Sequence, residues 1–593
     1  MKDFFKMLLA SCLGSMIMFG IGIFLVLALI IGSVASIVSM AGNTEKTVVV
    51  TSNSVLQLDL TKSVYERAPS DLDMYLEGNQ VLGADIILKS INNAKYDDNI
   101  SGIYVKTSAM YSAGWAVTEE IRNALIDFKT SGKFIYAYSD AYTQKGYYLA
   151  TVADSLFVNP SGIIDFKGIA AETVFIKDLL KKLDVDVKLI RPRSNSFKSA
   201  GEMYTMTKMS EANKTQVREY IESIWNHVVG DISAARNISV QDLNTIADNL
   251  GAYLPKGALE TKMVDGLRFE YEVLQSMAEE LGVYDADPYG IDFVKVKNYA
   301  QTIVEPRYSD KIAVIYAQGD VVQGKGSGVK VYSTTITNAI DVAAADDDIK
   351  AIVLRVNSPG GAVVASEIMT NAVMRAKEKK PIVVSMSDMA ASAGYEISCN
   401  AHKIVAMPTT ITGSIGVFGL YPEIGGMLKN KLGVTSDTVL TNKNAAALST
   451  MRPLSEESYN LLVNNVEDFY KTFCQRVAVG RNLSVEYVDS IARGRVWTGI
   501  DAQRLGLVDE LGGLERALEI AAQLAEVEDY SVVSYPKTKD AVSQLMEMLS
   551  QEEAMKILAE KTADKDILKY YKHIEEISNM YPYQARLPYF IEF

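Results

Sequence analysis

An internal repeat is the feature that most constrains the fold of this chain. Residues 134–169 resemble residues 382–417, with Ser139 matching Ser387, 248 positions further along. Flanking stretches on both sides match in the same order. Ordered self-similarity at a fixed spacing marks a duplicated structural unit, so we expect two copies of one unit of about 240 residues.

Each copy alternates apolar runs with helical patterns. The runs AIVLRV at 351–356 and PIVVSM at 381–386 are continuous buried-strand segments, each followed by an amphipathic pattern. Parallel strands with crossover helices give this alternation, because helices cover both faces of the sheet. We therefore expect an α/β fold, with a first repeat over residues 45–300 and a second over 301–536. The length of 593 residues also calls for more than one domain.

The N-terminal segment is expected to be a membrane anchor. Residues 7–44 carry no charge and include an apolar run longer than the ~20 residues that a helix needs to cross a bilayer. A cleaved signal peptide has a shorter apolar core, of about 7–15 residues. Lys2 and Lys6 precede the run, and the positive-inside tendency places them in the cytoplasm. Residues 1–44 would then be a cytoplasmic tip and a single-pass transmembrane helix in the inner (cytoplasmic) membrane, with the remaining ~550 residues outside the cytoplasm.

Composition excludes some function classes. A net charge of -14 argues against a nucleic-acid-binding face, which is basic. Cys12, Cys399 and Cys474 fit neither a metal-ligand spacing nor a disulfide framework, and the three histidines are scattered. We expect no metal and no other cofactor.

Residues 537–593 are charged and rich in Met and Leu, which predicts a helical tail for capping or oligomer packing.

Two short motifs follow consecutive strands in the second repeat. The first strand runs into Ser358-Pro-Gly360-Gly361, and paired glycines let backbone N–H groups approach a ligand as in an oxyanion hole. After the next strand, Ser392 lies among small residues at a strand-to-helix junction, and the amide of Ala393 lies at the start of the helix. Alone, the first motif is a turn and Ser392 a helix N-cap. Together, at the ends of consecutive strands, they favour a catalytic site.

The segments RVNSPGGAV, DMAASAGYEI, TGSIGVFG and VWTGIDAQRLGLVDELGGL resemble the long, duplicated form of signal peptide peptidase A. The resemblance covers most of the chain from the anchor to about residue 535. It implies two tandem crotonase/Clp-protease-like repeats behind the transmembrane helix. It also implies a serine peptidase that works through an acyl-enzyme, with Ser392 as nucleophile and Lys198 of the first repeat as general base. Met203 stands where the lysine motif of the family usually has Pro.

The same resemblance assigns further roles. Gln144 occupies the position of Ser392 in the first repeat, which makes that repeat a degenerate one that donates the lysine. From their places in the two motifs, Gly360, Gly361 and Ala393 are the candidate oxyanion residues. Ser414 either supports the lysine amine, as an equivalent serine of the family lies near the site, or is a turn residue. The implied substrates are apolar peptides, namely remnant signal peptides cut in or near the membrane, and the implied assembly is a homotetramer.

A lysine base makes specific physical demands. A serine hydroxyl is a weak nucleophile and needs a base within hydrogen-bond reach. The pKa of a free lysine is near 10.4, and burial must lower it by about 3 units, which costs roughly 4 kcal/mol. Lys443 is a rival to Lys198, because each lies twelve residues before a serine, Ser455 and Ser210 respectively. Single-repeat relatives take the lysine from the same repeat as the serine. The surroundings FKSAGE favour Lys198, but Lys443 stays open.

The alternatives to a Ser/Lys peptidase are a Clp-type Ser/His peptidase, a crotonase-type acyl-CoA enzyme and a non-catalytic membrane scaffold. A Clp-type Ser/His peptidase would carry a histidine about 25 residues after the nucleophile, and none lies there; His402 is only ten residues on. A crotonase-type acyl-CoA enzyme would need paired carboxylates. A non-catalytic membrane scaffold fits the first repeat but not the second.

Overall fold

The computed structural model describes residue 18 and residues 49–68, 81–326, 328–537 and 584–586. No helix within these described residues is long and apolar enough to cross a bilayer. The expected anchor over residues 1–44 lies outside them except for Met18, as does the tail over residues 537–593 except for its first residue and one short strand. Contacts divide the chain into two units, and the larger one (Val50–Ala68, Val81–Lys537 and His573–Phe593) contains both repeats.

The first repeat is built on a six-stranded sheet whose neighbouring strands all run parallel. The strand order is β8-β6-β5-β4-β1-β9. The strands are β1 (Ser54–Leu60), β4 (Ile100–Thr107), β5 (Phe134–Tyr142), β6 (Ser155–Ile164), β8 (Gly266–Leu267) and β9 (Phe293–Lys295). Its principal helices are α3 (Ala84–Tyr96), α4 (Trp115–Lys129), α5 (Gln144–Ala150), α11 (Glu270–Glu280) and α12 (Val296–Thr302).

The second repeat has the same strand order, now β20-β16-β15-β13-β10-β21, with β17 added beside β15 and β19 beside β17. The strands are β10 (Lys311–Gln318), β13 (Ile349–Ser358), β15 (Ile382–Ala391), β16 (Lys403–Ala406), β17 (Ile411–Gly413), β19 (Val496–Thr498), β20 (Glu510–Leu511) and β21 (Ser531–Tyr535). The predicted α/β class and the predicted duplication are both confirmed. Strand for strand, the two sheets match as the sequence repeat requires.

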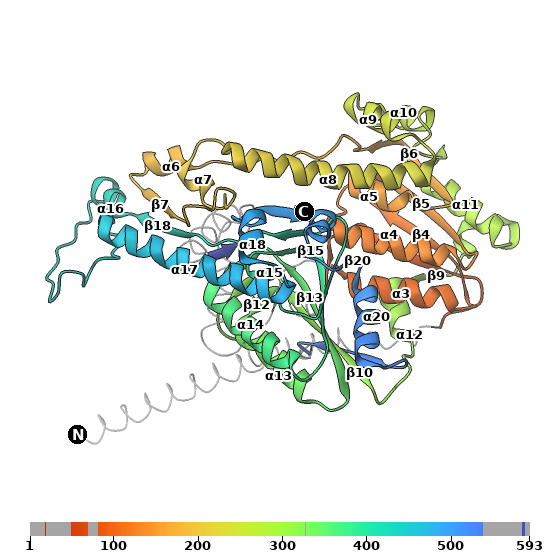
Figure 1. Ribbon diagram of the computed structural model, residues 1–593. Helices are drawn as coiled ribbons and strands as arrows, with labels where there is room; N and C mark the ends of the chain where they lie inside the picture. Colours follow the sequence, from red (N-terminus) through yellow and green to blue (C-terminus); the bar gives the residue numbers. More distant parts are fainter. Residues whose placement is uncertain (1–17, 19–48, 69–80, 327, 538–583, 587–593) are drawn as a thin grey trace, which may run out of the picture. The chain divides into compact units, whose positions relative to one another are not determined.

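Helices cover both faces of the second sheet (Figure 1). On β10, Ala313 and Ile315 belong to the core under α13 (Ser333–Ala345) and α14 (Val363–Lys377). Ile312 and Val314 belong to the core under α20 (Leu514–Ala525) on the other face. Because successive strand residues point to opposite faces, a strand buried on both sides must be apolar throughout. This explains the continuous apolar runs in the sequence.

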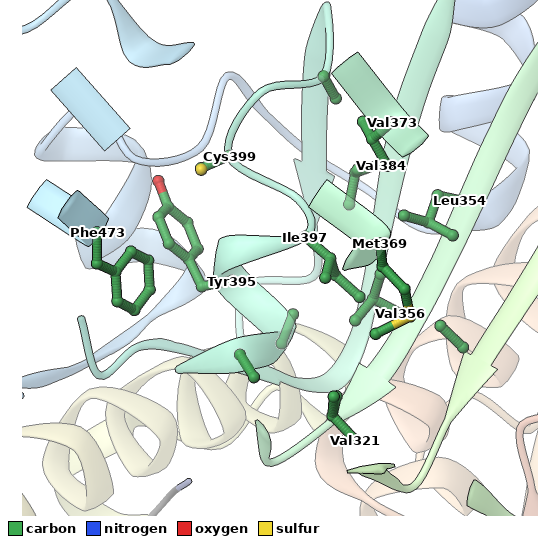
Figure 2. Packing of buried hydrophobic residues seen from close by; sticks show 14 of the residues in the cluster. Val321, Leu354, Val356, Met369, Val373, Val384, Tyr395, Ile397, Cys399 and Phe473 are labelled. Atoms are coloured by element: carbon green, nitrogen blue, oxygen red, sulfur yellow. The ribbon is translucent and has the colours of Figure 1, made fainter. Parts of the chain in front are cut away.

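The core beneath α14 reaches the segment that follows β15 (Figure 2). Leu354 and Val356 of β13 and Met369 of α14 share one buried cluster with Tyr395 and Ile397. Tyr395 is fully buried, and its hydroxyl donates a hydrogen bond to the carbonyl of Leu507, at 2.9 Å. The start of the short helix α15 (Ala393–Glu396) is therefore anchored in the main core.

Two long helices also reveal the duplication. α8 (Glu211–Arg236) and α17 (Glu456–Arg481) each have 26 residues. Each begins after a serine whose hydroxyl accepts the backbone N–H three residues on, and each ends at an asparagine in the left-handed region. The two helices therefore share both their length and the residue types that cap their ends.

The repeats are joined by a two-stranded antiparallel sheet. In it β7 (Asp186–Ile190) of the first repeat pairs with β18 (Gly419–Glu423) of the second. Lys198 lies in the segment after β7, so this pairing brings that segment against the second repeat.

The glycine pair after β13 forms a short strand, β14 (Gly360–Ala362). β14 belongs to a four-stranded sheet of order β12-β11-β14-β22, with β11 (Asp320–Val322), β12 (Lys330–Tyr332) and β22 (Gln584–Arg586). The local sequence does not reveal this pairing with distant strands, and Gly360 has a φ of +106°, which favours glycine.

A buried ion network also ties the repeats together. Arg355 on β13 is fully buried, and its guanidinium lies 2.6 Å from Glu66 and 2.5 Å from Glu120, both in the first repeat. A third hydrogen bond runs to the hydroxyl of Ser385 at 2.7 Å. Burying one charge without its partners is costly, so this network holds only when all its members are in place.

Replacing Arg355 by Met should lower the free energy of unfolding by about 3–5 kcal/mol, because Glu66 and Glu120 would stay buried without a cation. The matched control is Arg375→Met, which breaks a half-exposed pair with Asp341 and should cost about 0–1 kcal/mol. Denaturant unfolding followed by circular dichroism measures both. Equal destabilisation of the two variants would contradict a joining role for Arg355.

Candidate active site

Ser392 lies at a sharp junction between β15 and α15. Its backbone has φ 57° and ψ −116°, a combination that costs energy for any residue other than glycine. A strained strand-to-helix turn of this kind positions a serine hydroxyl just beyond the end of a strand. Gly394 makes the turn close: a Cβ there would lie 2.8 Å from the carbonyl oxygen of Ser358.

The amine of Lys198 lies against this serine. Lys198 Nζ is 2.7 Å from Ser392 Oγ, and it donates to the hydroxyl of Ser414 at 2.9 Å and to the carbonyl of Ser414 at 3.0 Å. All three residues are fully buried. Burial holds the pKa of Lys198 well below its usual value. A neutral amine has a lone pair that can accept the proton of the Ser392 hydroxyl.

Backbone contacts from both repeats hold Lys198 in place. The N–H of Phe197 donates to the carbonyl of Arg493 at 3.1 Å, and Arg191 donates to the carbonyl of Lys198 at 3.2 Å. Gly494, at φ +80°, lies so close that a Cβ would be 2.5 Å from the Cβ of Lys198. Only glycine fits there, so the second repeat closes over the lysine stem and excludes water.

The expected oxyanion residues lie beside the nucleophile. Ala393 is the first residue of α15, so its N–H has no partner within the helix. β14, which carries Gly360 and Gly361, contacts α15. The N–H of Gly360 donates to the hydroxyl of Ser358 at 3.2 Å, so it is already used within the loop. Gly361 lies opposite Val321 of β11 and Ala585 of β22, so Ala393 is the best placed of the three.

Lys443, the rival base, is on an exposed loop. Its side chain is 80% exposed and forms an ion pair with Glu457 at 2.8 Å, which raises the pKa of Lys443. The structure therefore brings Lys198, and not Lys443, to Ser392.

Gln144, the counterpart of Ser392 in the first repeat, has different partners. Its side-chain oxygen accepts the N–H groups of Lys167 and Gly168, both at 3.0 Å. The amide thus braces the loop after β6, and this position holds no nucleophile.

The histidines of the described region lie apart from the serine. His402 Nδ1 accepts the N–H of Ile382 at 3.0 Å, and His227 pairs with Glu119 at 2.7 Å. The side-chain hydrogen bonds of Ser392 run to Lys198 and, at 3.4 Å, to the carbonyl of Gly416. No histidine of the described region is therefore positioned as its base.

One side-chain cluster has metal-ligand geometry. Ligand atoms of Glu119, His227 and Asp231 lie within 4.8 Å of one another. Each is already engaged: Thr409 donates to Glu119 at 2.8 Å, and Tyr148 donates to Asp231 at 2.5 Å. Together with the His227–Glu119 hydrogen bond, these contacts make the cluster a polar network between the repeats.

Sequence reasoning missed several residues that build the site. The carbonyl of Gly416 lies 3.4 Å from Ser392 Oγ, and the backbone of Gly494 lies against Lys198. Gln216 on α8 donates to the carbonyl of Phe197 at 3.0 Å. Asn195 is fully buried three residues before Lys198, and its carbonyl accepts the N–H of that lysine at 3.3 Å. The only available signal was the proximity of Asn195 and Gly416 to motif residues.

Comparison with known proteins places this site in a family. The model of Peptidase family S49 matches residues 127–284 and 374–528, one segment in each repeat. Protease 4 of Salmonella typhi is 34% identical over 526 residues, covering 84% of this chain and 83% of that protein. Protease 4 of Haemophilus influenzae is 31% identical over 546 residues, covering 87% of each.

A plant relative extends the match. Serine protease SPPA, chloroplastic, of Arabidopsis thaliana is 31% identical over 458 residues, covering 76% of this chain and 67% of that protein. A solved ClpP1 structure from Listeria monocytogenes aligns with 35% of this chain and 94% of its own, at a TM-score of 0.24 and 14% identity, which is too low to support an argument. The family match and the full-length relatives agree with one another: the chain belongs to peptidase family S49 and is a serine protease of the Protease 4 or SppA type.

Proposed function

We propose that this protease cuts peptide bonds with Ser392 as nucleophile and Lys198 as general base. The observation that carries the proposal is the 2.7 Å separation of Lys198 Nζ and Ser392 Oγ in a fully buried environment. Burial favours the neutral amine, which a base must be, and the contacts with Ser414 orient its lone pair toward the serine.

The proposed reaction has two halves. The Ser392 proton passes to the Lys198 amine while Oγ bonds to the substrate carbonyl carbon. The resulting oxyanion accepts hydrogen bonds from the N–H of Ala393 and from an N–H of the Gly360–Gly361 pair. The C–N bond then breaks, and the lysine returns its proton to the leaving nitrogen, which leaves an acyl-enzyme. In the second half a water gives a proton to the Lys198 amine while its oxygen bonds to the acyl carbon. The bond between that carbon and Ser392 Oγ then breaks, and Lys198 returns the proton to Oγ, which releases the acid and restores both side chains.

The finer points of the proposal concern substrate and setting. We propose that the substrates are apolar peptides of the kind left after signal peptide cleavage, and that the protein acts as a membrane-anchored homotetramer with its sites outside the cytoplasm. The apolar N-terminal segment and the basic residues before it support the anchor and its orientation. A crotonase/Clp-like fold is part of the same proposal, supported by the motifs at the ends of β13 and β15.

Ser392→Ala should reduce hydrolysis of an apolar fluorogenic peptide by at least about 10³-fold, because the nucleophile is lost. The matched control is Gln144→Ala, at the same position of the first repeat, which should keep activity within about threefold of wild type. Both variants should melt cooperatively in a thermal scan. Residual turnover of Ser392→Ala within tenfold of wild type would remove this serine from the role of nucleophile.

Lys198→Ala should lower kcat/KM by about 10²–10⁴, whereas Lys443→Ala should leave it unchanged. Since the base must be neutral, wild-type activity should rise with pH through the lowered pKa of Lys198, and the midpoint of that rise should lie below the ~10.4 of a free lysine. Rate–pH profiles of the two variants and of wild type measure this. An inactive Lys443→Ala beside an active Lys198→Ala would make each second repeat a self-contained site.

The proposed orientation predicts that a protease added to cells with a permeabilised outer layer digests the bulk of the chain. Antibodies to the two ends of the chain, used on blots, follow the digestion, and an intact cytoplasmic protein serves as the control for leakage. Protection of the bulk would reverse the anchor and would remove secreted peptides as substrates.

A further inference from the structure

The strand that leads to the nucleophile bulges out of its pairing with β13. Between Val356 and Ser358 the register with β15 shifts by two positions, so residues 387–389 of β15 oppose Asn357 alone. Bulges bend a strand and are common next to active sites, where they redirect a side chain. Because this bulge ends three residues before Ser392, its shape sets the path along which the chain reaches the nucleophile.

The side chain of Asn357 holds the bulge in place. Its Nδ2 donates to Oδ2 of Asp388 at 3.2 Å, and its Oδ1 accepts the N–H of Met389 at 3.2 Å. Asn357 directly precedes Ser358 and the candidate oxyanion glycines. One amide therefore joins the oxyanion loop to the strand that carries the nucleophile.

The other carboxylate oxygen of Asp388 reaches the first repeat. Oδ1 accepts the N–H of Val117, in the first turn of α4, at 3.0 Å. The carboxylate also packs on Gly114, where a Cβ would lie 1.9 Å from the carboxyl carbon. Burial raises the pKa of Asp388, whereas the Val117 contact and the charge of Lys145 act against that rise. The N-terminus of a helix favours a negative charge, so this contact ties the bulge to the first repeat.

The aspartate at the same position of the first repeat has local partners. Asp140 is exposed, and its Oδ1 accepts the hydroxyl of Tyr138 at 2.6 Å and Nδ2 of Asn159 at 2.8 Å. The register of β5 against β6 also shifts at Asp140. Both repeats thus keep the bulge and its aspartate, and the copy beside the nucleophile is the one that binds the opposite repeat.

We propose that Asp388 is a positioning residue, which uses the N-terminus of α4 to hold Ser392 within proton-transfer distance of Lys198. The proposal rests on the proposed function of these two residues. Lys198 belongs to the first repeat and Ser392 to the second, so their 2.7 Å separation depends on how the repeats meet. Asp388 fastens the nucleophile strand to the repeat that donates the base. A misplacement of about 1 Å can cost about 10²-fold in rate, so this contact affects catalysis without touching the substrate.

The test begins in the first repeat, with Gly114→Ala in the full-length protein. The backbone of Gly114, at φ −71° and ψ 167°, accepts alanine, but the new Cβ would overlap the Asp388 carboxylate and displace it. We expect kcat for an apolar fluorogenic peptide to fall by about tenfold or more, with KM within about twofold of wild type. Rates are expressed per Ser392 that a fluorophosphonate labels at completion, which removes unfolded enzyme from kcat.

Asp388→Ala should lower kcat to the same extent, and Gly114→Ala should add nothing in that background, because the carboxylate through which it acts is gone. Asp388→Asn keeps an oxygen for the Val117 N–H, so its kcat should lie between those of Asp388→Ala and wild type. The matched controls are Asp140→Ala, at the equivalent aspartate, and Gly230→Ala, whose Cβ would have nothing within 4 Å. Both controls should keep kcat within about twofold of wild type.

Thermal scans show which variants are folded. A folded Gly114→Ala or Asp388→Ala with wild-type kcat would overturn the inference, as would additive losses in the double variant. A parallel loss of kcat in Asp140→Ala would also overturn it, because the effect would then not depend on contact between the repeats. Wild-type protein without any Ser392-dependent cleavage would instead contradict the proposed function.

Discussion

The contact between the amine of Lys198 and the hydroxyl of Ser392 is the interaction on which the site depends, and it crosses from one repeat to the other. A lysine at this position is useful only when water is excluded, because solvent would keep the amine protonated. The exclusion comes from the second repeat, whose backbone at Gly494 and Ser414 closes over the lysine. Neither repeat could form this site alone.

Duplication followed by divergence explains the asymmetry. The two sheets share one strand order, and α8 and α17 share their length and caps. Yet the first repeat has Gln144 bound to backbone N–H groups where the second has its serine. The second repeat, in turn, has its counterpart lysine, Lys443, in solvent. Each copy keeps one half of the site. The two copies must therefore stay packed in one arrangement for Lys198 to reach Ser392.

Buried charge at the junction fixes how the repeats meet. Asp388, four residues before the nucleophile, accepts the N–H of Val117 at the start of α4, at 3.0 Å, and burial raises its pKa. Arg355 reaches Glu66 and Glu120 from the neighbouring strand. Buried polar groups tolerate little displacement, because each lost partner leaves an uncompensated group in a dry environment. β13, which carries Ser358, and β15, which leads into Ser392, are thus aligned against the first repeat by the same contacts that join the repeats.

The sequence by itself determined the duplication, the α/β class and the serine at the strand-to-helix junction, because each depends on local pattern or on self-similarity. It left two lysines at equal distances from matching serines, and only the tertiary structure decided which of them reaches Ser392. Burial decides that question, and burial is set by β7 pairing with β18 and by the close approach of Gly494. The strand conformation of Gly360 and its pairing with residues near the C-terminus were likewise beyond the sequence. Edge-to-edge pairing across more than 220 residues leaves no periodic signal in either partner, since backbone groups that every residue carries make the bonds.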